Sequence, residues 1–218
     1  MTTEHEVGAV RLSARLRGVS PPVTRRIWIG EQASLAELHA VLQVAFGWSD
    51  EHLYAFQIRG WQFGDPSRAI GLALAGGGVD IALAAFRFEI GEPFLYQYNL
   101  FVPWEIDCRI EARGLIRAAQ PVTCLAARGD PPDEDLPGPA AYPQWLMDSD
   151  PAWVLHRIEK LLDEDFDDVR FRAEACDILA QARGAPPTRR TIAARLQQLP
   201  GNAWDAGSLY EDAGPAGH

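Results

Sequence analysis

Two histidines, His39 and His52, have the side chains best suited to acid–base or metal chemistry in this sequence. A neutral imidazole accepts a proton or a metal ion near neutral pH. In an enzyme one of them would be the base, and Glu105 or Asp107 would be its partner or the acid. A zinc site needs a third ligand, and no spacing in the sequence provides one, so we predict no metal site and no cofactor. The structural alternative is that His39 is a hydrogen-bonded core residue, because it lies on the apolar face of a predicted helix.

The second candidate group is aromatic. The side chains that we expect to line a binding pocket are Trp48, Tyr54, Tyr96, Tyr98, Asn99 and Trp104. Aromatic rings with polar tips line ligand pockets, but most such rings fill cores. In an enzyme, Tyr96, Tyr98 and Asn99 would orient the substrate.

Charge separates two regions of the chain. The formal charge of -10 disfavours a general nucleic-acid binder, because the protein as a whole repels phosphate. Five arginines could form a local basic edge or pair with acids, and they are Arg11, Arg15, Arg17, Arg25 and Arg26. Residues 130–168 contain twelve acids but only Arg157 and Lys160 as basic residues. This stretch predicts a solvated acidic surface or a contact with a basic partner.

Several common sites are missing from the sequence. Residues 76–78 are glycines that predict a flexible loop, without the Lys and Ser/Thr of a phosphate-binding loop. The acids of residues 163–168 lack the glycine and the spacing of an EF-hand. The three cysteines form no C-x-x-C pair, which favours free thiols in the cytoplasm. No apolar run reaches the length of about 18 residues that a membrane span needs, so we expect no membrane contact.

These side chains must be positioned by a sheet and an early helix. Alternation or β-rich composition predicts strands at residues 10–16, 23–29, 53–59, 86–90, 94–100 and 104–112. Ser34 and Glu37 form a capping box, which starts a helix over residues 34–46, and Gly47 ends it. We expect Leu35, Leu38, Leu42 and Phe46 to be buried against the strands.

After Pro121 we expect the strands to stop. A loop rich in proline and acids leads to predicted helices at residues 142–147, 151–162, 168–183 and 188–199. The helices after residue 150 should cover the other face or an end of the sheet, to bury Trp153, Ile158, Leu161, Leu162, Phe171, Ile178 and Leu179. The expected fold is α+β, with a mixed or mainly antiparallel sheet of five or six strands. Residues 1–120 would form the core, residues 121–200 would pack on it in one globular unit, and residues 201–218 would be a tail.

Four ordered motifs carry a family resemblance. They are Leu16-Arg17-Gly18-Val19-Ser20-Pro21-Pro22-Val23-Thr24-Arg25-Arg26, Leu35-Ala36-Glu37-Leu38-His39, Phe46-Gly47-Trp48 and His52-Leu53-Tyr54-Ala55-Phe56. Together they resemble the plasmid pRiA4b ORF-3-like family, which occurs on plasmids and beside transposases, over about residues 10–142. The one departure is Thr24, where the family has Trp. The resemblance implies a fold and a mobile-element context, but no reaction.

A later block of the family resembles Y-x-Y-D-F-G-D-x-W-x-H, which corresponds here to residues 96–106. Both tyrosines and the tryptophan are present, but Asn99, Val102 and Ile106 replace two acids and a histidine. A metal or acid–base site in that block would therefore not operate in this chain. A further block, P-P-E-D-x-G-G-P-x-G-Y, is similar to residues 131–142, which contain one extra acid near Asp133.

The sequence therefore leads to three functional hypotheses. The leading one is a binding module of mobile-element origin that holds a small apolar ligand or a protein partner in an aromatic pocket. The alternative is a cofactor-independent cyclase, isomerase or lyase that acts on a small apolar substrate. The third is a DNA-associated plasmid or transposon protein, which the overall negative charge disfavours.

Overall fold

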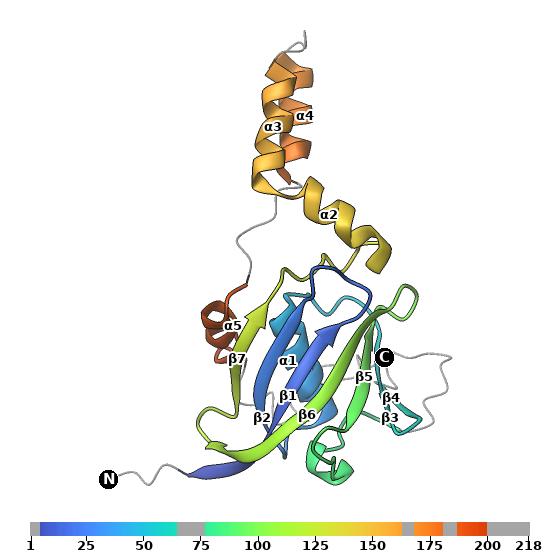
Figure 1. The fold of residues 1–218 in the computed structure, drawn as a ribbon, viewed down its shortest axis with the longest axis vertical. Helices are drawn as coiled ribbons and strands as arrows, with labels where there is room; N and C mark the ends of the chain where they lie inside the picture. The colour runs from blue at the N-terminus through green and yellow to red at the C-terminus, as the bar shows by residue number, and fades with distance from the viewer. Residues whose placement is uncertain (1–4, 65–76, 163–167, 181–186, 200–218) are drawn as a thin grey trace, which may run out of the picture.

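The protein is an α+β structure with one antiparallel sheet, and the computed structural model describes residues 5–64, 77–162, 168–180 and 187–199. The sheet has seven strands in the order β4-β3-β5-β6-β1-β2-β7 (Figure 1). Neighbouring strands are antiparallel throughout. The strands are β1 (Glu6–Leu16), β2 (Thr24–Gly30), β3 (Tyr54–Ile58), β4 (Trp61–Gly64), β5 (Pro93–Tyr98), β6 (Trp104–Arg117) and β7 (Val122–Arg128).

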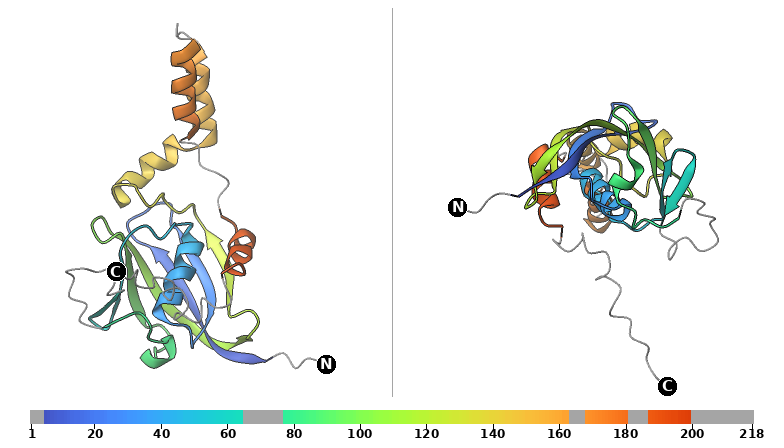
Figure 2. Two further views of the ribbon diagram at one scale, coloured as in Figure 1. Left: turned by 180° about the vertical axis from the view of Figure 1, so that it is seen from behind. Right: turned by 90° about the horizontal axis from the view of Figure 1, so that it is seen from below.

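Helix α1 (Leu35–Phe46) packs on one face of this sheet (Figure 2). The capping box is present as predicted, since the Ser34 side chain accepts from the Glu37 amide and the Glu37 carboxylate accepts from the Ser34 amide. Gly47 ends the helix in the left-handed conformation, with φ 74°. The four apolar residues predicted to face the strands are fully buried, namely Leu35, Leu38, Leu42 and Phe46. The main core therefore lies between α1 and the sheet.

The opposite face of the central strands carries charged and amide side chains. Strand alternation places Trp104, Ile106 and Cys108 toward α1, and it places Glu105 and Asp107 on the outer face. A sheet with one packed and one solvated face is common among antiparallel folds. Candidate residues on opposite faces of β6 therefore cannot contact each other.

The structure corrects two strand predictions. Residues 86–90 are not a strand, because the short helix η1 (Leu83–Phe86) and turns occupy this region. The strands do not stop at Pro121, because β7 pairs with β2 at the sheet edge. The prolines and acids that follow predict a loop here, but Val122 and Cys124 alternate with more exposed neighbours, as in a strand. The hairpin between β3 and β4 turns through Arg59 and Gly60, both at positive φ, as a two-residue turn of this kind requires.

The later helices separate into two groups. After the short helix η2 (Pro139–Ala141) and α2 (Tyr142–Asp148), helices α3 (Pro151–Leu162) and α4 (Asp168–Ala180) pack on each other and project beyond the end of the sheet (Figure 1). We call α3 and α4 the arm. Helix α5 (Arg189–Leu196) returns to the main body and packs on β7 and α1. The end of the predicted helix at residues 181–183, and the predicted tail, lie outside the described residues.

The expectation that the arm buries its apolar residues against the sheet is wrong in part. Val154, Leu161 and Ile178 form a small core of their own, with Ile158 and Phe171 half-buried around it. Trp153, Leu162 and Leu179 are exposed, by 41%, 68% and 54%. Two helices that pack only on each other bury one stripe each and leave other apolar side chains in solvent.

Candidate functional site

His39 belongs to a closed ring of hydrogen bonds inside the protein. Its Nδ1 lies 2.8 Å from the Tyr96 hydroxyl, and its Nε2 lies 2.9 Å from Oδ1 of Asp50. The Gln43 amide donates to the same hydroxyl at 2.8 Å, and the Asp50 backbone N–H donates to Oε1 of Gln43 at 3.1 Å. Because the Asp50 carboxylate can only accept, Nε2–H of His39 donates to it, and Nδ1 of the neutral imidazole then accepts from the Tyr96 hydroxyl. We call His39, Gln43, Asp50 and Tyr96 the polar ring.

The polar ring has the order of an acid–histidine–hydroxyl relay, but its imidazole and hydroxyl are buried, and its acid, Asp50, is 40% exposed. His39 is 5% exposed and Tyr96 is 0% exposed. The imidazole stacks on Tyr54 with 3.5 Å between ring centroids and 5° between planes. Burial raises the pKa of Tyr96 well above its usual range, so the hydroxyl stays neutral. This environment supports the interpretation of His39 as a hydrogen-bonded core residue.

The second histidine lies where the acidic loop covers the aromatic side chains, and we define the acidic loop as residues 130–138. Nε2 of His52 is 3.1 Å from Oδ1 of Asp135. Glu134 accepts from the Tyr98 hydroxyl and, at 2.7 Å and 2.5 Å, from the backbone N–H and hydroxyl of Ser49. Burial and the bond to Glu134 raise the pKa of Tyr98.

Two indoles also hold the acidic loop. Nε1 of Trp48 donates to the Pro132 carbonyl at 3.0 Å, and Nε1 of Trp104 donates to the Glu134 carbonyl at 3.1 Å. Trp48 stacks on Tyr98, with 5.0 Å between ring centroids. A loop held by both backbone and side-chain contacts is part of the packed structure rather than a loose cover.

The five rings predicted to line a pocket form a buried cluster, which we call the aromatic cluster. Their exposed fractions are between 0% and 7%, and the residues are Trp48, Tyr54, Tyr96, Tyr98 and Trp104. Asn99 lies in the turn between β5 and β6 at φ 57°, where its Oδ1 accepts from the Val102 N–H at 3.4 Å. Asparagine tolerates this left-handed conformation better than most residues, so Asn99 has a clear role in the turn.

The structure does not bring Glu105 or Asp107 to either histidine. Both carboxylates lie on the outer face of β6 and pair with Arg17, at 3.1 Å and 2.6 Å. The aromatic cluster lies on the other face, because successive side chains of a strand point to opposite sides. The acids that pair with the histidines are Asp50 for His39 and Asp135 for His52.

The predicted basic edge is divided between two environments. Arg11 and Arg26 share Glu111, at 3.0 Å and 2.7 Å, so ion pairing neutralises part of this surface. Arg25 is 1% exposed and lies on the α1 side. Its Nε donates to the Ala45 carbonyl at 2.7 Å and its Nη1 to the Arg128 carbonyl at 2.9 Å. Burial lowers the pKa of Arg25 to about 10, which leaves the guanidinium charged at neutral pH.

The described residues contain no group of three or more His, Cys, Asp or Glu side chains that could hold a metal ion. Cys108 and Cys124 are free and buried, and burial raises the pKa of both thiols. Raised thiol pKa values disfavour nucleophilic chemistry, because the thiolate is the reactive form. In the described part of the chain, no helix is long and apolar enough to cross a membrane.

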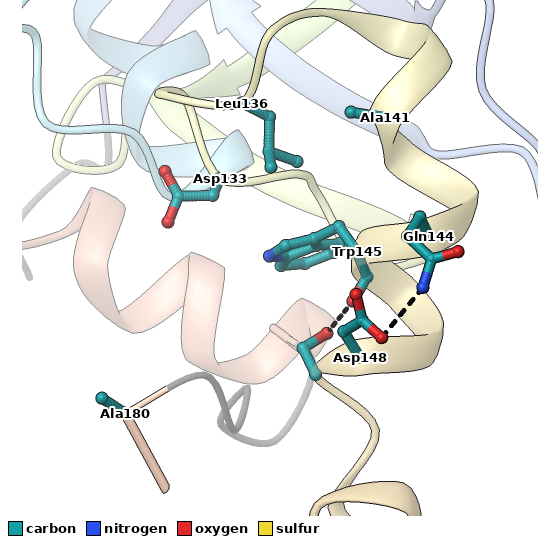
Figure 3. A pocket seen from close by; sticks show the side chains of 8 residues that line it. Asp133, Leu136, Ala141, Gln144, Trp145, Asp148 and Ala180 are labelled. Carbon is teal, nitrogen blue, oxygen red and sulfur yellow. Dashed lines mark hydrogen bonds between the residues drawn. The ribbon is translucent and has the colours of Figure 1, made fainter. Parts of the chain in front are cut away.

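Two open cavities among the described residues lie on either side of α2. A cavity of about 430 Å³ lies between the acidic loop and α2, and Figure 3 shows Asp133, Leu136, Trp145 and Asp148 around it. A second cavity, of about 580 Å³, is lined by Leu146, Met147, Asp150, Ala152, Trp153 and His156. None of the site residues predicted from the sequence lines either cavity, because the lining side chains come together only when the acidic loop, α2 and α3 are in place.

Two features define the class to which this protein belongs. One is an antiparallel sheet with α1 on its packed face, and the other is an acidic loop bound to Ser49, His52 and Tyr98. Residues 8–175 match the family described as plasmid pRiA4b ORF-3-like protein, and the chain belongs to that family. The match extends beyond residue 142, the limit of the motifs in the sequence, and includes α2, α3 and part of α4.

One curated relative and one solved structure are similar to this chain. The uncharacterized protein y4hQ from Sinorhizobium fredii is 34% identical over 152 residues, which cover 67% of this chain and 76% of that protein. The protein of unknown function MM3350 from Methanosarcina mazei Go1 shares the fold in its crystal structure, with a TM-score of 0.58. That likeness covers 73% of this chain and 91% of that one at 22% identity. Neither name states an activity.

The family motifs can now be explained by contacts. Glu134 and Asp135 correspond to the two acids of the P-P-E-D block, and they bind Tyr98 and His52 from two earlier motifs. The substituted position Ile106 is fully buried beside the rings, and Val102 is 39% exposed in the turn. The motif positions therefore hold the acidic loop on the aromatic cluster.

Proposed function

We propose that this protein is a binding module of mobile-element origin, and that it docks a protein partner on α2 and α3. The observation that carries the proposal is the cavity of about 580 Å³ between these helices. Met147 and Trp153 line it and are 58% and 41% exposed. Leu146 lines the same cavity and is half-buried. An exposed apolar cavity of this kind is typical of a protein–protein contact.

Charge favours a basic partner. Asp150 lines the apolar cavity, and Asp148 of α2 and Asp133 of the acidic loop line the cavity on the other side of α2. A basic amphipathic segment would cover the apolar side chains and meet these carboxylates at the rim. A second copy of this acidic chain would bring like charges together, which is unfavourable.

The other functions have less support. A small apolar ligand in the aromatic cluster would have to displace the acidic loop, because the rings are at most 7% exposed. The enzymatic alternative loses the expected contact between a histidine and Glu105 or Asp107. The DNA-binding alternative is weakened by the ion pairs of Arg11, Arg17 and Arg26.

The proposal can be tested with a fluorescein-labelled helical peptide that has leucine and tryptophan on one face and arginine on the other. Fluorescence anisotropy of the labelled peptide should report saturable binding to the full chain. Met147→Asp and Trp153→Asp should each weaken it at least about tenfold, because burial of a large apolar side chain contributes about 1.5–3 kcal/mol. Leu115→Asp is the matched control, since Leu115 is 64% exposed on β6, away from α2.

Equal binding by the wild type, Met147→Asp and Trp153→Asp would contradict the proposal. So would an apparent affinity that depends on self-association, which sedimentation measures. Duplex DNA at low salt provides a separate test. Binding that weakens steeply as salt rises would favour the DNA-associated alternative.

A further inference from the structure

We propose that the cavity between the acidic loop and α2 receives an arginine side chain of the partner, an inference that rests on the proposed docking function. This cavity has a volume of about 430 Å³. Figure 3 shows the Trp145 indole between Asp133 of the acidic loop and Asp148 near the end of α2. An aromatic face, two carboxylates and the apolar side chain of Leu136 are the groups that an arginine can use together.

The walls of the cavity are held in place before any partner arrives. The Trp145 ring stacks on Tyr142, with 5.8 Å between centroids. Tyr142 is fully buried, and its hydroxyl donates to the Asp130 carbonyl at 2.7 Å. Ser149 is buried and donates to the Trp145 carbonyl through both its hydroxyl and its backbone N–H. A preformed site reduces the entropy that binding would otherwise lose.

The carboxylates still have hydrogen-bonding capacity. One oxygen of Asp148 accepts from the Gln144 amide at 2.9 Å, and Oδ1 of Asp133 accepts from the Asp135 backbone N–H at 3.0 Å. Within the described part of the chain, the other oxygen of each carboxylate makes no hydrogen bond. These oxygens can accept N–H groups from a cation that enters the cavity.

A guanidinium suits this site better than an ammonium. It is planar, it stacks on an indole, and its five N–H donors spread in a fork toward carboxylates on different sides. An ammonium is a compact and more strongly hydrated charge, so it loses more on entering a partly apolar cavity. The methylene stem of arginine would pack on Leu136.

The position of the cavity indicates a protein side chain rather than a free cation. At 100° per residue, Trp145 and Asp148 point to one side of α2, and Leu146 and Met147 point to the other. The helix has seven residues and is about 10 Å long. One partner segment can therefore cover the apolar cavity and place an arginine across α2 in the acidic one.

The test uses the full chain and the arginine-bearing peptide described above. Each arginine of the peptide is replaced in turn by citrulline, which keeps the shape and removes the charge, and by lysine. One citrulline replacement should weaken binding at least tenfold, and lysine should weaken it several-fold. Against the double variant Asp133→Asn/Asp148→Asn, the same citrulline replacement should change the affinity less than twofold. The variant Asp177→Asn is the matched control, because Asp177 is exposed on α4 and its change removes the same kind of charge.

Two results would overturn the inference while the docking proposal stands. One is that every citrulline peptide binds as tightly as the arginine peptide, while Met147→Asp still abolishes binding. The other is that Asp177→Asn weakens binding as much as the double variant does. A titration with ethylguanidinium tests the cavity without the peptide. The indole N–H resonance of Trp145 reports binding, and sodium chloride at equal ionic strength is the control. A saturable shift without peptide binding would support the cavity and overturn the docking proposal, and no shift together with no peptide binding would overturn both.

Discussion

The polar ring shows how a histidine can have the partners of a catalytic residue without access to a substrate. His39 has a carboxylate on Nε2 and a hydroxyl on Nδ1, but the hydroxyl belongs to Tyr96, which is 0% exposed. Buried polar groups that satisfy one another stabilise a unique packing. We therefore assign the polar ring to stability, and the predictions for its residues concern unfolding rather than turnover.

Replacement of Tyr96 by phenylalanine tests this assignment. Tyr96→Phe removes the acceptor of the buried Gln43 amide and the donor to Nδ1 of His39, so the free energy of unfolding should fall by about 1–3 kcal/mol. Urea denaturation measures the change. The control is Gln57→Leu, which removes an exposed amide–amide bond to Gln97 and should stay within about 0.5 kcal/mol. An unfolding free energy unaffected by Tyr96→Phe would mean that the polar ring does not stabilise the core.

Alkaline pH should act through the same phenols. Burial raises the pKa of both Tyr96 and Tyr98 above the unfolded value near 10. The folded protein therefore keeps protons that the unfolded chain releases, so the stabilisation is complete below about pH 10 and decreases as the pH rises above it. The free energy of unfolding between pH 8.5 and 11.5, about the range where a phenol loses its proton, should fall less steeply in Tyr98→Phe. An identical slope in the variant and the wild type would contradict this expectation.

Glu134 should determine whether the acidic loop stays on the aromatic cluster. Glu134→Ala removes the acceptor for Tyr98 and for both donors of Ser49, which should loosen the loop over Trp48 and Trp104. Tryptophan emission should then shift to longer wavelength, and quenching by acrylamide should increase. Glu51→Ala is the control, because Glu51 is an exposed glutamate two residues beyond Ser49. Unchanged emission in Glu134→Ala would show that the indole bonds alone hold the loop.

One buried arginine connects three secondary-structure elements, namely β2, α1 and β7. Arg25 in β2 donates to carbonyls at the end of α1 and at the end of β7. Its ring contact with Phe46, at 5.1 Å, places the guanidinium at the edge of the main core. The cation therefore joins the helix to the sheet where neither makes backbone hydrogen bonds to the other.

Arg25→Lys should destabilise the protein by about 2–3 kcal/mol, although the charge is kept, because an ammonium cannot reach the same carbonyls in a planar fork. Arg26→Lys, at the neighbouring residue on the outer face, should cost less than about 1 kcal/mol, since Arg26 is half-exposed and its ion pair with Glu111 lies at the surface. Thermal or urea unfolding of both variants gives the comparison. Equal losses would mean that the carbonyl contacts of Arg25 contribute little.

The whole molecule divides into a main body and an arm of different local stability. The main core includes α1, the sheet and α5, whereas the arm has three buried apolar residues of its own. Amide hydrogen exchange should therefore be fast in α3 and α4 and slow in β1, β6 and α1. Helix α5 should be protected with the main body, because Ile192 and Leu196 are buried in the main core. Exchange in α5 as fast as in the arm would contradict its assignment to the main body.

A docking surface on a less stable arm is physically reasonable. Elements that bind partners often come from the part of a protein with few buried contacts. A partner that covers Met147 and Trp153 would add apolar burial where the arm has little. Hydrogen exchange in α3 should then slow when the basic peptide is bound, and this slowing links the stability of the arm to the proposed function.

Sequence patterns over a few residues were sufficient to predict α1, β1 and β6. The capping box and Gly47 determined both ends of α1, and alternation identified β1 and β6, because these signals involve residues within a few positions of one another. The four ordered motifs also indicated the family correctly. The same reasoning missed β7 and placed a strand at residues 86–90, since an edge strand and an apolar turn have similar local composition.

Only the tertiary structure decided which side chains meet. Asp50 lies near His39 in the sequence, but Tyr96 is 57 residues away from it, and Glu134 is 36 residues beyond Tyr98. The alternation of β6 can be seen in the sequence, but the face that packs on α1 depends on how the strands pair. The pairing places Glu105 and Asp107 on the outer face, away from both histidines. The arm left Trp153 exposed for a similar reason. Apolar periodicity indicates that one face of a helix or strand can be buried. The contacts available in three dimensions determine whether this chain buries that face or leaves it for a partner.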